Sequence, residues 1–362
     1  MTSAVRTDLD RHALILLCAP ASLGGGAVPS FGPAAWHGLE RVLVDRRLSP
    51  GQLLGMSGTE LEANVGLTTD QAHRVSRLLG RGGPVAIEIE RLASRGIWIA
   101  ALGDETYPPR LVETLGDEAP PLLFGVGSAA VAAQHGLAIV GSRDADDDAI
   151  AYTETVAASA VKGGLTIVSG AARGVDAAAM TSALEHGGSA VGVVADGLEK
   201  RIREPQIRTW LADDRLCLLT PYGSNTGFSV GAAMGRNKLI YGLSVFALVI
   251  AATPGRGGTW AGATEALKNG WSTVFVRQSS DHATGDGLES LGAIPFADSF
   301  PDVITVDVLE SLATLEGKGS HAVAESGGEG ALAAVQATLF GEPEALPTSK
   351  ATRKKSVERR AG

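Results

Sequence analysis

The chain has 362 residues and a mass of 37.0 kDa, which suits about two folded units plus tails. Hydrophobic residues make up 44% and charged residues 20%, a balance that excludes wholesale disorder and predicts a globular protein. The longest apolar runs, residues 13–19 and 245–252, fall well short of the ~20 residues of a membrane-spanning helix, so we expect no contact with a membrane.

The formal net charge of −9 argues against a protein that coats nucleic acid through bulk charge, so any phosphate partner must be held locally. The charge is segregated, because residues 350–360 carry six cations against Glu358. Cys18 and Cys217 are too far apart in sequence to form a metal-binding pair, and the histidines show no HxH or HxxxH spacing. We therefore expect no metal, no cofactor and a cytoplasmic protein.

Residues 8 to about 80 carry apolar residues at helical spacing, such as Leu39, Val42 and Leu43, without strand-like runs. This pattern predicts a small all-helical module over residues 1–82, similar to SAM or helix-hairpin-helix modules. Residues 66–75 (GLTTDQAHRV) resemble the helix-hairpin-helix pattern G-h-G-x-x-x-A-x-x-h, with Thr68 at the second glycine. We expect a helix start capped there by Thr68 or Thr69, with a phosphate contact as the alternative.

Gly-Gly-Pro at 82–84 marks a break, after which short apolar runs alternate with helical segments. Near-continuously apolar strands separated by helices predict an α/β domain over residues 83–316, with a doubly wound parallel sheet. The expected strands are 97–101, 137–140, 165–168, 190–194, 216–219, 246–251 and 273–276. Beyond residue 316 the composition turns to Gly, Ser, Glu and Ala, which predicts a flexible tail over 317–362.

Four segments with glycine and basic residues lie at or beside expected strand ends. Strand 137–140 runs into Gly141-Ser142-Arg143, and strand 165–168 runs into residues 169–176 (SGAARGVD). Residues 255–259 (GRGGT) follow the strand that begins at 246, and residues 235–244 (GRNKLIYGLS) precede it. Glycines let a backbone approach an anion, helix-start amides donate to it, and arginines add charge-assisted hydrogen bonds. We expect all four segments to meet at the carboxyl edge of the sheet.

These segments, with residues 107–111 (YPPRL) and 120–125 (PPLLFG), resemble the DNA-processing protein A family (DprA, also called Smf) in order and spacing. The family pattern reads YPxxL, PPxLFxxG, AIVGSR, SGxAxGID and RNRxIxGLS, and the resemblance covers roughly residues 97–295. It implies an extended Rossmann-like domain that binds single-stranded DNA and self-associates as a homodimer. It also implies a role in loading the RecA recombinase during natural transformation.

The resemblance further implies that the protein is not an enzyme and that its site binds backbone phosphates with slight sequence preference. Asp176 is expected to complement its helix start or orient an arginine, and Asn237 to organise a loop. The candidate phosphate-binding residues are Gly141, Ser142, Arg143, Ser169, Gly170, Arg173, Gly174, Asp176, Arg236, Asn237, Lys238, Gly257, Gly258 and Thr259.

The chain departs from the family pattern at several places. Residues 220–221 (TP) stand where Ser-Glu is usual, and residues 251–252 (AA) stand where Glu-Ala is usual. The loop 197–205 lacks the usual Tyr-Pro and carries Lys200, Arg201 and Arg203. These departures indicate a divergent branch. They leave open an alternative function, a nucleotide- or DNA-sensing component of a phage-defence or toxin–antitoxin system.

Two enzymatic interpretations compete with DNA binding. Residues 125–130 (GVGSAA) fit the dinucleotide fingerprint GxGxxA, but they follow a very short apolar run and no acid ends a suitable second strand, which disfavours NAD. Residues 254–259 (PGRGGT) are similar to the PGGxGTxxE of nucleoside-monophosphate phosphoribohydrolases. The nearby acid, Glu265, lies six residues after Thr259 instead of three, so we expect it to be a solvated helix residue.

The tail contains a further partner motif. Residues 336–340 (QATLF), from Gln336 to Phe340, resemble the QxxLF peptide by which bacterial proteins dock on the replication sliding clamp. The alternative is that Leu339 and Phe340 are merely exposed apolar residues. The basic end at 350–360 is interpreted as a phosphate-attracting arm or a solubilising tail.

Overall fold

The computed structural model describes residues 7–25, 28–278 and 282–322, and residues up to Leu315 belong to one compact unit. The tail residues Gln336 to Phe340 and 350–360 lie outside the described residues. The strands are β1 (Ile97–Ala101), β2 (Leu122–Gly127), β3 (Gly136–Val140), β4 (Thr166–Ser169), β5 (Ala190–Val193), β6 (Leu216–Thr220), β7 (Phe246–Val249), β8 (Thr273–Arg277) and β9 (Ile294–Phe296).

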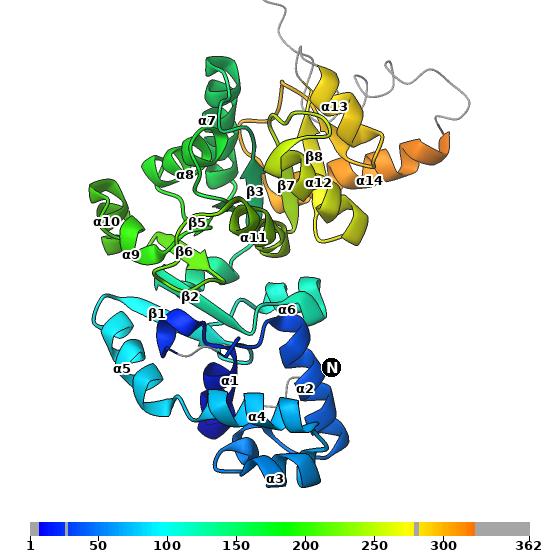
Figure 1. The fold of residues 1–362 in the computed structure, drawn as a ribbon. Coiled ribbons are helices and arrows are strands. Elements are labelled where there is room, and N and C mark those ends of the chain that lie inside the picture. The colour runs from blue at the N-terminus through cyan, green and yellow to red at the C-terminus, as the bar shows by residue number, and fades with distance from the viewer. Residues whose placement is uncertain (1–6, 26–27, 279–281, 323–362) are drawn as a thin grey trace, which may run out of the picture. The chain divides into compact units, whose positions relative to one another are not determined.

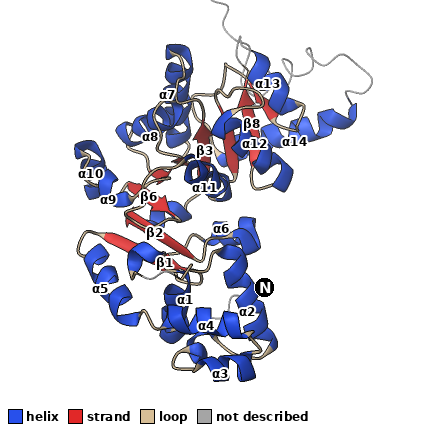
Figure 2. Cartoon of the chain, viewed as in Figure 1, coloured by secondary structure: helices blue, strands red, loops and turns tan. Residues whose placement is uncertain are grey.

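Helices precede the first strand and alternate with most of the later strands (Figure 2). They are α1 (Asp8–Cys18), α2 (Pro33–Asp45), α3 (Gly58–Glu60), α4 (Thr69–Leu79), α5 (Gly82–Ala93), α6 (Pro109–Leu115), α7 (Asp147–Lys162), α8 (Val175–Glu185), α9 (Leu198–Arg201), α10 (Pro205–Ala212), α11 (Val230–Gly242), α12 (Gly257–Asn269), α13 (His282–Glu289) and α14 (Val306–Ala322). Short 3₁₀ or π turns lie at Ala21–Leu23, Pro50–Leu53, Leu61–Val65, Gly116–Glu118 and Ala129–Ala133. No helix in this described part of the chain is both long and apolar enough to cross a membrane.

The strands form one sheet in the order β1-β2-β6-β5-β4-β3-β7-β8-β9 (Figure 1). Strand β1 runs antiparallel to β2, and β2 runs antiparallel to β6. All other neighbouring pairs are parallel, including β3 with β4 on one side and with β7 on the other. The predicted fold class, a doubly wound α/β domain preceded by helices, is therefore confirmed.

Successive residues of β3 enter two different hydrophobic cores. Leu137 and Ile139 pack in one core, to which α7 and α8 contribute, whereas Ala138 and Val140 pack in the other, to which α11 and α12 contribute. Because successive side chains of a strand point to opposite faces of a sheet, the two cores lie on its two faces. Burial on both faces explains why the central strands are continuously apolar in sequence.

The described chain before β1 contains helices as its only regular elements. Thr68 caps α4: its hydroxyl accepts from the backbone N–H of Gln71, and the Gln71 side chain accepts from the backbone N–H of Thr68. This reciprocal pair confirms the helix start expected at Thr68 or Thr69. The division of the chain at residues 82 and 316 stays a prediction.

Four features differ from the sequence-based expectations. The sequence does not predict β2, because two prolines precede this strand and two glycines lie within it. It does not predict β9 either, because that strand is only three residues long. The expected break at 82–84 is the first turn of α5, where a proline is tolerated because the first helical N–H groups have no partner in the helix. Helix α14 continues to Ala322, past the expected start of the tail.

The structure also explains the glycines of the dinucleotide-like segment. Gly125 and Gly127 lie in β2, which pairs only with antiparallel neighbours. A Cβ atom on Gly125 would collide with the Trp98 ring, and one on Gly127 would collide with the Leu216 carbonyl. These glycines therefore permit close packing within the sheet, and they do not open the β-α-β unit that a dinucleotide site requires.

Candidate phosphate-binding site

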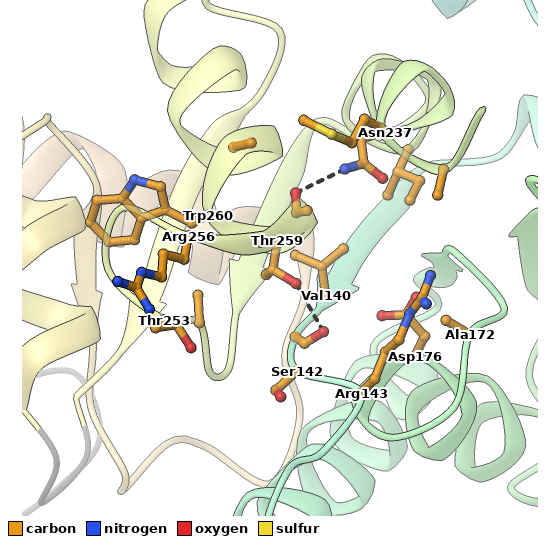
Figure 3. A pocket seen from close by; sticks show the side chains of 18 of the residues that line it. Val140, Ser142, Arg143, Ala172, Asp176, Asn237, Thr253, Arg256, Thr259 and Trp260 are labelled. Atoms are coloured by element: carbon orange, nitrogen blue, oxygen red, sulfur yellow. Dashed lines mark hydrogen bonds between the residues drawn. The ribbon is translucent and has the colours of Figure 1, made fainter. Parts of the chain in front are cut away.

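The sheet reverses its winding direction between β3 and β7. From β3 the chain proceeds through β4, β5 and β6 on one side, and then returns to the other side of β3 for β7, β8 and β9. Open α/β sheets bind ligands at the carboxyl ends of the strands at such a reversal. A cavity of about 650 Å³ lies there, lined by the loops after β3 and β7, by α11 and by the start of α12 (Figure 3).

The structure brings together most of the candidate residues that the sequence indicates. Those that line the cavity are Gly141, Ser142, Arg143, Asp176, Arg236, Asn237, Gly257, Gly258 and Thr259. Ser169, Gly170, Arg173, Gly174 and Lys238 are not among its lining residues. The predicted convergence of the four segments is thus observed, although not every residue of each segment reaches the cavity.

Two exposed arginines supply the cavity with positive charge. Arg143 follows β3, and its guanidinium carbon lies 5.2 Å from the ring centroid of Phe228. Arg256 precedes α12 and is exposed as well. Neither arginine forms an ion pair with any residue that the structure describes. Both charges are therefore available to an anion.

Helix α12 presents an N-terminus whose first N–H groups receive no side-chain cap, because the capping position is Arg256. The neighbouring helices differ. The carboxylate of Asp146 accepts from the N–H of Ala149 at the start of α7, and the first N–H of α8, that of Val175, donates to the Ser142 carbonyl at 3.3 Å. Each of these two helix starts therefore has one N–H engaged, although α8 also lacks a side-chain cap. Helix α12, whose start lines the cavity, provides an open anion-binding terminus.

Two hydrogen bonds fix the start of α12 against the rest of the cavity (Figure 3). The Asn237 side-chain amide of α11 donates to the Gly258 carbonyl at 2.9 Å. The Thr259 hydroxyl donates to the Gly141 carbonyl at 3.0 Å. Asn237 therefore organises the loop, as expected from the sequence, and both bonds hold the helix terminus in position before any ligand arrives.

A buried ion pair lies behind the exposed arginines. Arg236 is only 4% exposed. Its Nη2 atom donates to the Gly170 carbonyl at 2.9 Å and lies 3.9 Å from the Oδ2 atom of Asp176. Burial raises the pKa of Asp176, an effect that the Arg236 charge and hydrogen bonds from nearby residues oppose. The Arg236 side chain thus joins α11 to the loop after β4, and its expected phosphate contact stays a prediction.

Three further candidates have partners within the protein, and their expected phosphate contacts stay predictions. The Ser169 hydroxyl is buried and donates to the Ile139 carbonyl at 2.7 Å. Arg173 forms an exposed ion pair with Asp144 at 2.8 Å, and Lys238 pairs with Glu118 at 3.3 Å. Each group already has a protein partner, which explains why neither their charge nor their hydrogen-bonding capacity is directed into the cavity.

The glycines of these loops are required by packing as much as by ligand approach. A Cβ atom on Gly141 would collide with Val175, and one on Gly170 would collide with the Arg236 guanidinium. Gly174 has a φ of +78°, and a Cβ there would meet the carbonyl oxygens of residues 142 and 143. Small residues at these positions let the loops after β3 and β4 lie directly against each other.

Among the residues that line the cavity without being sequence candidates are one cation and two aromatic residues, Arg256, Phe228 and Trp260. Arg256 could have been found, because it lies inside the glycine-rich segment 255–259. Phe228 is 53% exposed in a loop without a recognisable motif, and only the fold shows that it stands beside Arg143. The sequence carries no signal for that placement.

The features expected of the enzymatic alternatives are not assembled here. Glu265 is exposed on α12 and is not among the residues that line the cavity. The carboxylate that does line it, that of Asp176, is engaged with Arg236. Over the described ranges there is no cluster of three or more His, Cys, Asp or Glu side chains that could hold a metal ion.

Fold and site together define a class, the Rossmann-like α/β proteins with an anion-binding cavity at the point where the sheet reverses its winding. A family model described as DNA recombination-mediator protein A matches residues 98–298, more than half of the chain. The chain belongs to this family of DNA-processing proteins.

Individual relatives agree with this assignment. Protein Smf of Synechocystis sp. is 34% identical over 161 residues, which are 42% of this chain and 39% of that protein. DNA processing protein DprA of Streptococcus pneumoniae is 28% identical over 190 residues, 52% of this chain and 66% of that protein. The solved structure of DNA processing protein A from Streptococcus pneumoniae is similar at a TM-score of 0.50 and 26% identity, covering 74% of this chain and 95% of that one. The sequence matches thus span less than two thirds of either curated relative.

Proposed function

We propose that this protein binds single-stranded DNA through backbone phosphates in the 650 Å³ cavity and that it acts in recombination without catalysing a reaction. One observation carries the proposal: Arg143 and Arg256, unpaired among the described residues, flank the uncapped N-terminus of α12. A helix terminus beside two guanidinium groups that have no ion-pair partner among the described residues is suited to a phosphate diester. Membership in a family of DNA-processing proteins supports the choice of DNA as the ligand.

Preference for a single strand follows from the aromatic side chains beside the cations. Phe228 is largely exposed and Trp260 is partly exposed, and both line the cavity. Unpaired bases stack on such rings, whereas bases in a duplex are already stacked on one another. We further propose that the protein works as a homodimer that delivers the strand to RecA, as its resemblance to the family implies.

Fluorescence anisotropy with labelled single-stranded and duplex DNA of matched sequence tests the proposal. We expect tighter binding of the single strand than of the duplex. The slope of the logarithm of the binding constant against the logarithm of the salt concentration should decrease in magnitude by about 0.7 for each of Arg143→Ala and Arg256→Ala. The decrease should not depend on DNA sequence, since phosphate contacts carry no base information.

Lys268→Ala provides a matched control. Lys268 is exposed in the last turn of α12, about 15 Å along the helix from the terminus that lines the cavity. An equal loss in this control, or unchanged salt dependence in folded arginine variants, would remove the cavity from DNA binding. Binding of a mononucleotide in preference to single-stranded DNA would favour the nucleotide-sensing alternative instead.

A further inference from the structure

A second, smaller cavity of about 240 Å³ adjoins the first. It lies between the start of α9 and the loop before α11, and one residue, Phe228, lines both cavities. The other residues that line the small cavity are Asp196, Gly197, Glu199, Lys200, Ser224, Asn225, Thr226 and Gly227. The two cavities therefore meet at an aromatic residue that borders both of them.

The walls of the small cavity are fixed by hydrogen bonds between its two loops. The N–H of Gly197 donates to the Thr226 carbonyl at 2.7 Å, and the N–H of Glu199 donates to the Ser224 carbonyl at 3.2 Å. The Ser224 side chain is buried and donates to the Glu199 carboxylate at 3.3 Å. These bonds mean that the cavity is formed without a ligand, so binding does not have to order it.

The acidic side chains of the small cavity are neutralised by the protein itself. Glu199 receives ion pairs from Arg91, at 2.7 Å, and from Arg95, both near the end of α5. Asp196 is paired with Arg201 at 3.3 Å. The negative charges therefore do not repel a polyanion. Glu199 is held by helix α5, which fixes the start of α9 to the helices that precede the sheet.

One cation of the small cavity has no such partner. Lys200 is exposed and forms no ion pair with any residue in the described part of the chain. It lies in α9, within the segment 197–205 in which this chain departs from the usual family pattern. An exposed lysine that lines a cavity is a point charge suited to a phosphate oxygen.

The size and the lining residues of the small cavity suit one nucleobase. Its volume is below the range of about 300–1,000 Å³ that whole small-molecule ligands occupy, so one planar ring system with its substituents is the appropriate size. Phe228 offers an aromatic surface for stacking, and the side chains of Asn225 and Thr226 offer donors and acceptors to the edge of a base. An inorganic phosphate would leave the aromatic wall unused.

We propose that the small cavity binds the nucleotide that adjoins the one held in the large cavity. Its base lies against Phe228, and its phosphate contacts Lys200. The proposal rests on the proposed function, because it extends the same DNA strand from one cavity into the next. It makes the binding unit two adjacent nucleotides, separated by the Phe228 side chain.

Phe228→Ala, Phe228→Tyr and Lys200→Ala test the proposal in the full chain. Loss of one stacked base should weaken binding of a short oligothymidylate about 5- to 150-fold in Phe228→Ala. Phe228→Tyr retains a ring and should bind like the unmodified protein. Lys200→Ala should lower the logarithmic salt dependence by about 0.7, and the Lys268→Ala control should not.

An oligonucleotide of the same length with abasic sites at every position separates stacking from a structural effect. The unmodified protein should lose at least as much affinity on the abasic strand as Phe228→Ala loses on the normal one. Phe228→Ala should lose less on the abasic strand than the unmodified protein does, because only the base contacts of Trp260, Asn225 and Thr226 remain to be lost. Because Phe228 lines both cavities, Lys200→Ala is the variant that is specific to the small one. Unchanged salt dependence in Lys200→Ala, or equal binding of normal strands by the unmodified protein and Phe228→Ala, would overturn the second site. If Arg143 and Arg256 still governed the salt dependence, the proposed function would stand. Failure of the unmodified protein to bind any single strand would overturn both.

Discussion

Basic side chains near the site differ in what they can offer a ligand, and the difference lies in their partners. Arg173 is 73% exposed but pairs with Asp144, and Lys238 pairs with Glu118 outside the cavity lining. An exposed ion pair of this kind is worth ~0–1 kcal/mol, so its loss has little effect on stability. The sequence motifs alone predict phosphate binding for these two residues as well as for Arg143.

We expect Arg173→Ala and Lys238→Ala to change affinity for single-stranded DNA less than twofold, since neither side chain lines the cavity. Arg143→Ala and Arg256→Ala, measured in the same anisotropy titration, should lose affinity and salt dependence together. Thermal denaturation of each variant serves as the folding control. A decrease for Arg173→Ala as large as that for Arg143→Ala would mean that the DNA path runs over α8 instead of α12.

The buried pair of Asp176 and Arg236 makes a prediction about stability. Asp176→Leu leaves a buried guanidinium uncompensated, and Arg236→Leu leaves a buried carboxylate, so each single change should lower the free energy of unfolding by about 3–5 kcal/mol. The free energy of unfolding of the double variant should fall by much less than the sum of the two single losses, because neither buried charge remains. Urea denaturation of the four proteins measures this coupling, and additive losses would show that the two side chains do not act as a pair.

At the scale of single elements, the cap of α1 contains a pH-dependent contact. The Asp10 carboxylate accepts from the N–H groups of Thr7, at 3.0 Å, and of Gly51, at 2.7 Å. Burial acts to raise the pKa of this carboxyl, but the hydrogen bonds prevail and lower it to about 2 from an ordinary value of 3.8. The folded state therefore binds a proton less readily at this position than the unfolded chain does.

A depressed pKa contributes stability that is fully present above the unfolded value, near pH 4, and is lost as pH falls toward 2. We expect Asp10→Asn to be less stable than the unmodified protein by about 2 kcal/mol at pH 7 and nearly equal to it at pH 2. Comparing the two proteins by urea denaturation at both pH values cancels the other titrating groups. A difference that does not depend on pH would show that shape, and not charge, holds this cap.

How much of the fold the sequence predicts depends on the kind of strand. Strands buried on both faces, such as β3, β7 and β8, are found to within one or two residues because their apolar runs are unbroken. β2 is missed because its pairing is antiparallel and its glycines are needed only for contacts such as that with Trp98. Tertiary contacts of that kind leave no local pattern in the sequence.

The candidate site shows the same limit at the scale of the whole molecule. Parallel strands share one carboxyl edge, so convergence of the four segments follows from the sequence. The strand order does not follow from it, and the order places β3 between β4 and β7, which decides that the loops after β3 and β7 form the cavity. Phe228 joins them only because α11 lies against α12, an arrangement that spacing along the chain cannot supply.

The distribution of charge over the whole chain makes the last prediction. The net charge is −9, yet residues 350–360 hold six cations that could attract DNA without any fitted site. In a full-length variant with these six cations replaced by glutamine, we expect affinity for a short single strand at 0.15 M salt to stay within about threefold, because the cavity arginines remain. Arg143→Ala should lower the salt dependence equally in both backgrounds. If the six replacements abolished binding while Arg143→Ala had no effect, the basic end would be the DNA-binding segment, and the cavity would be left for a small anionic ligand.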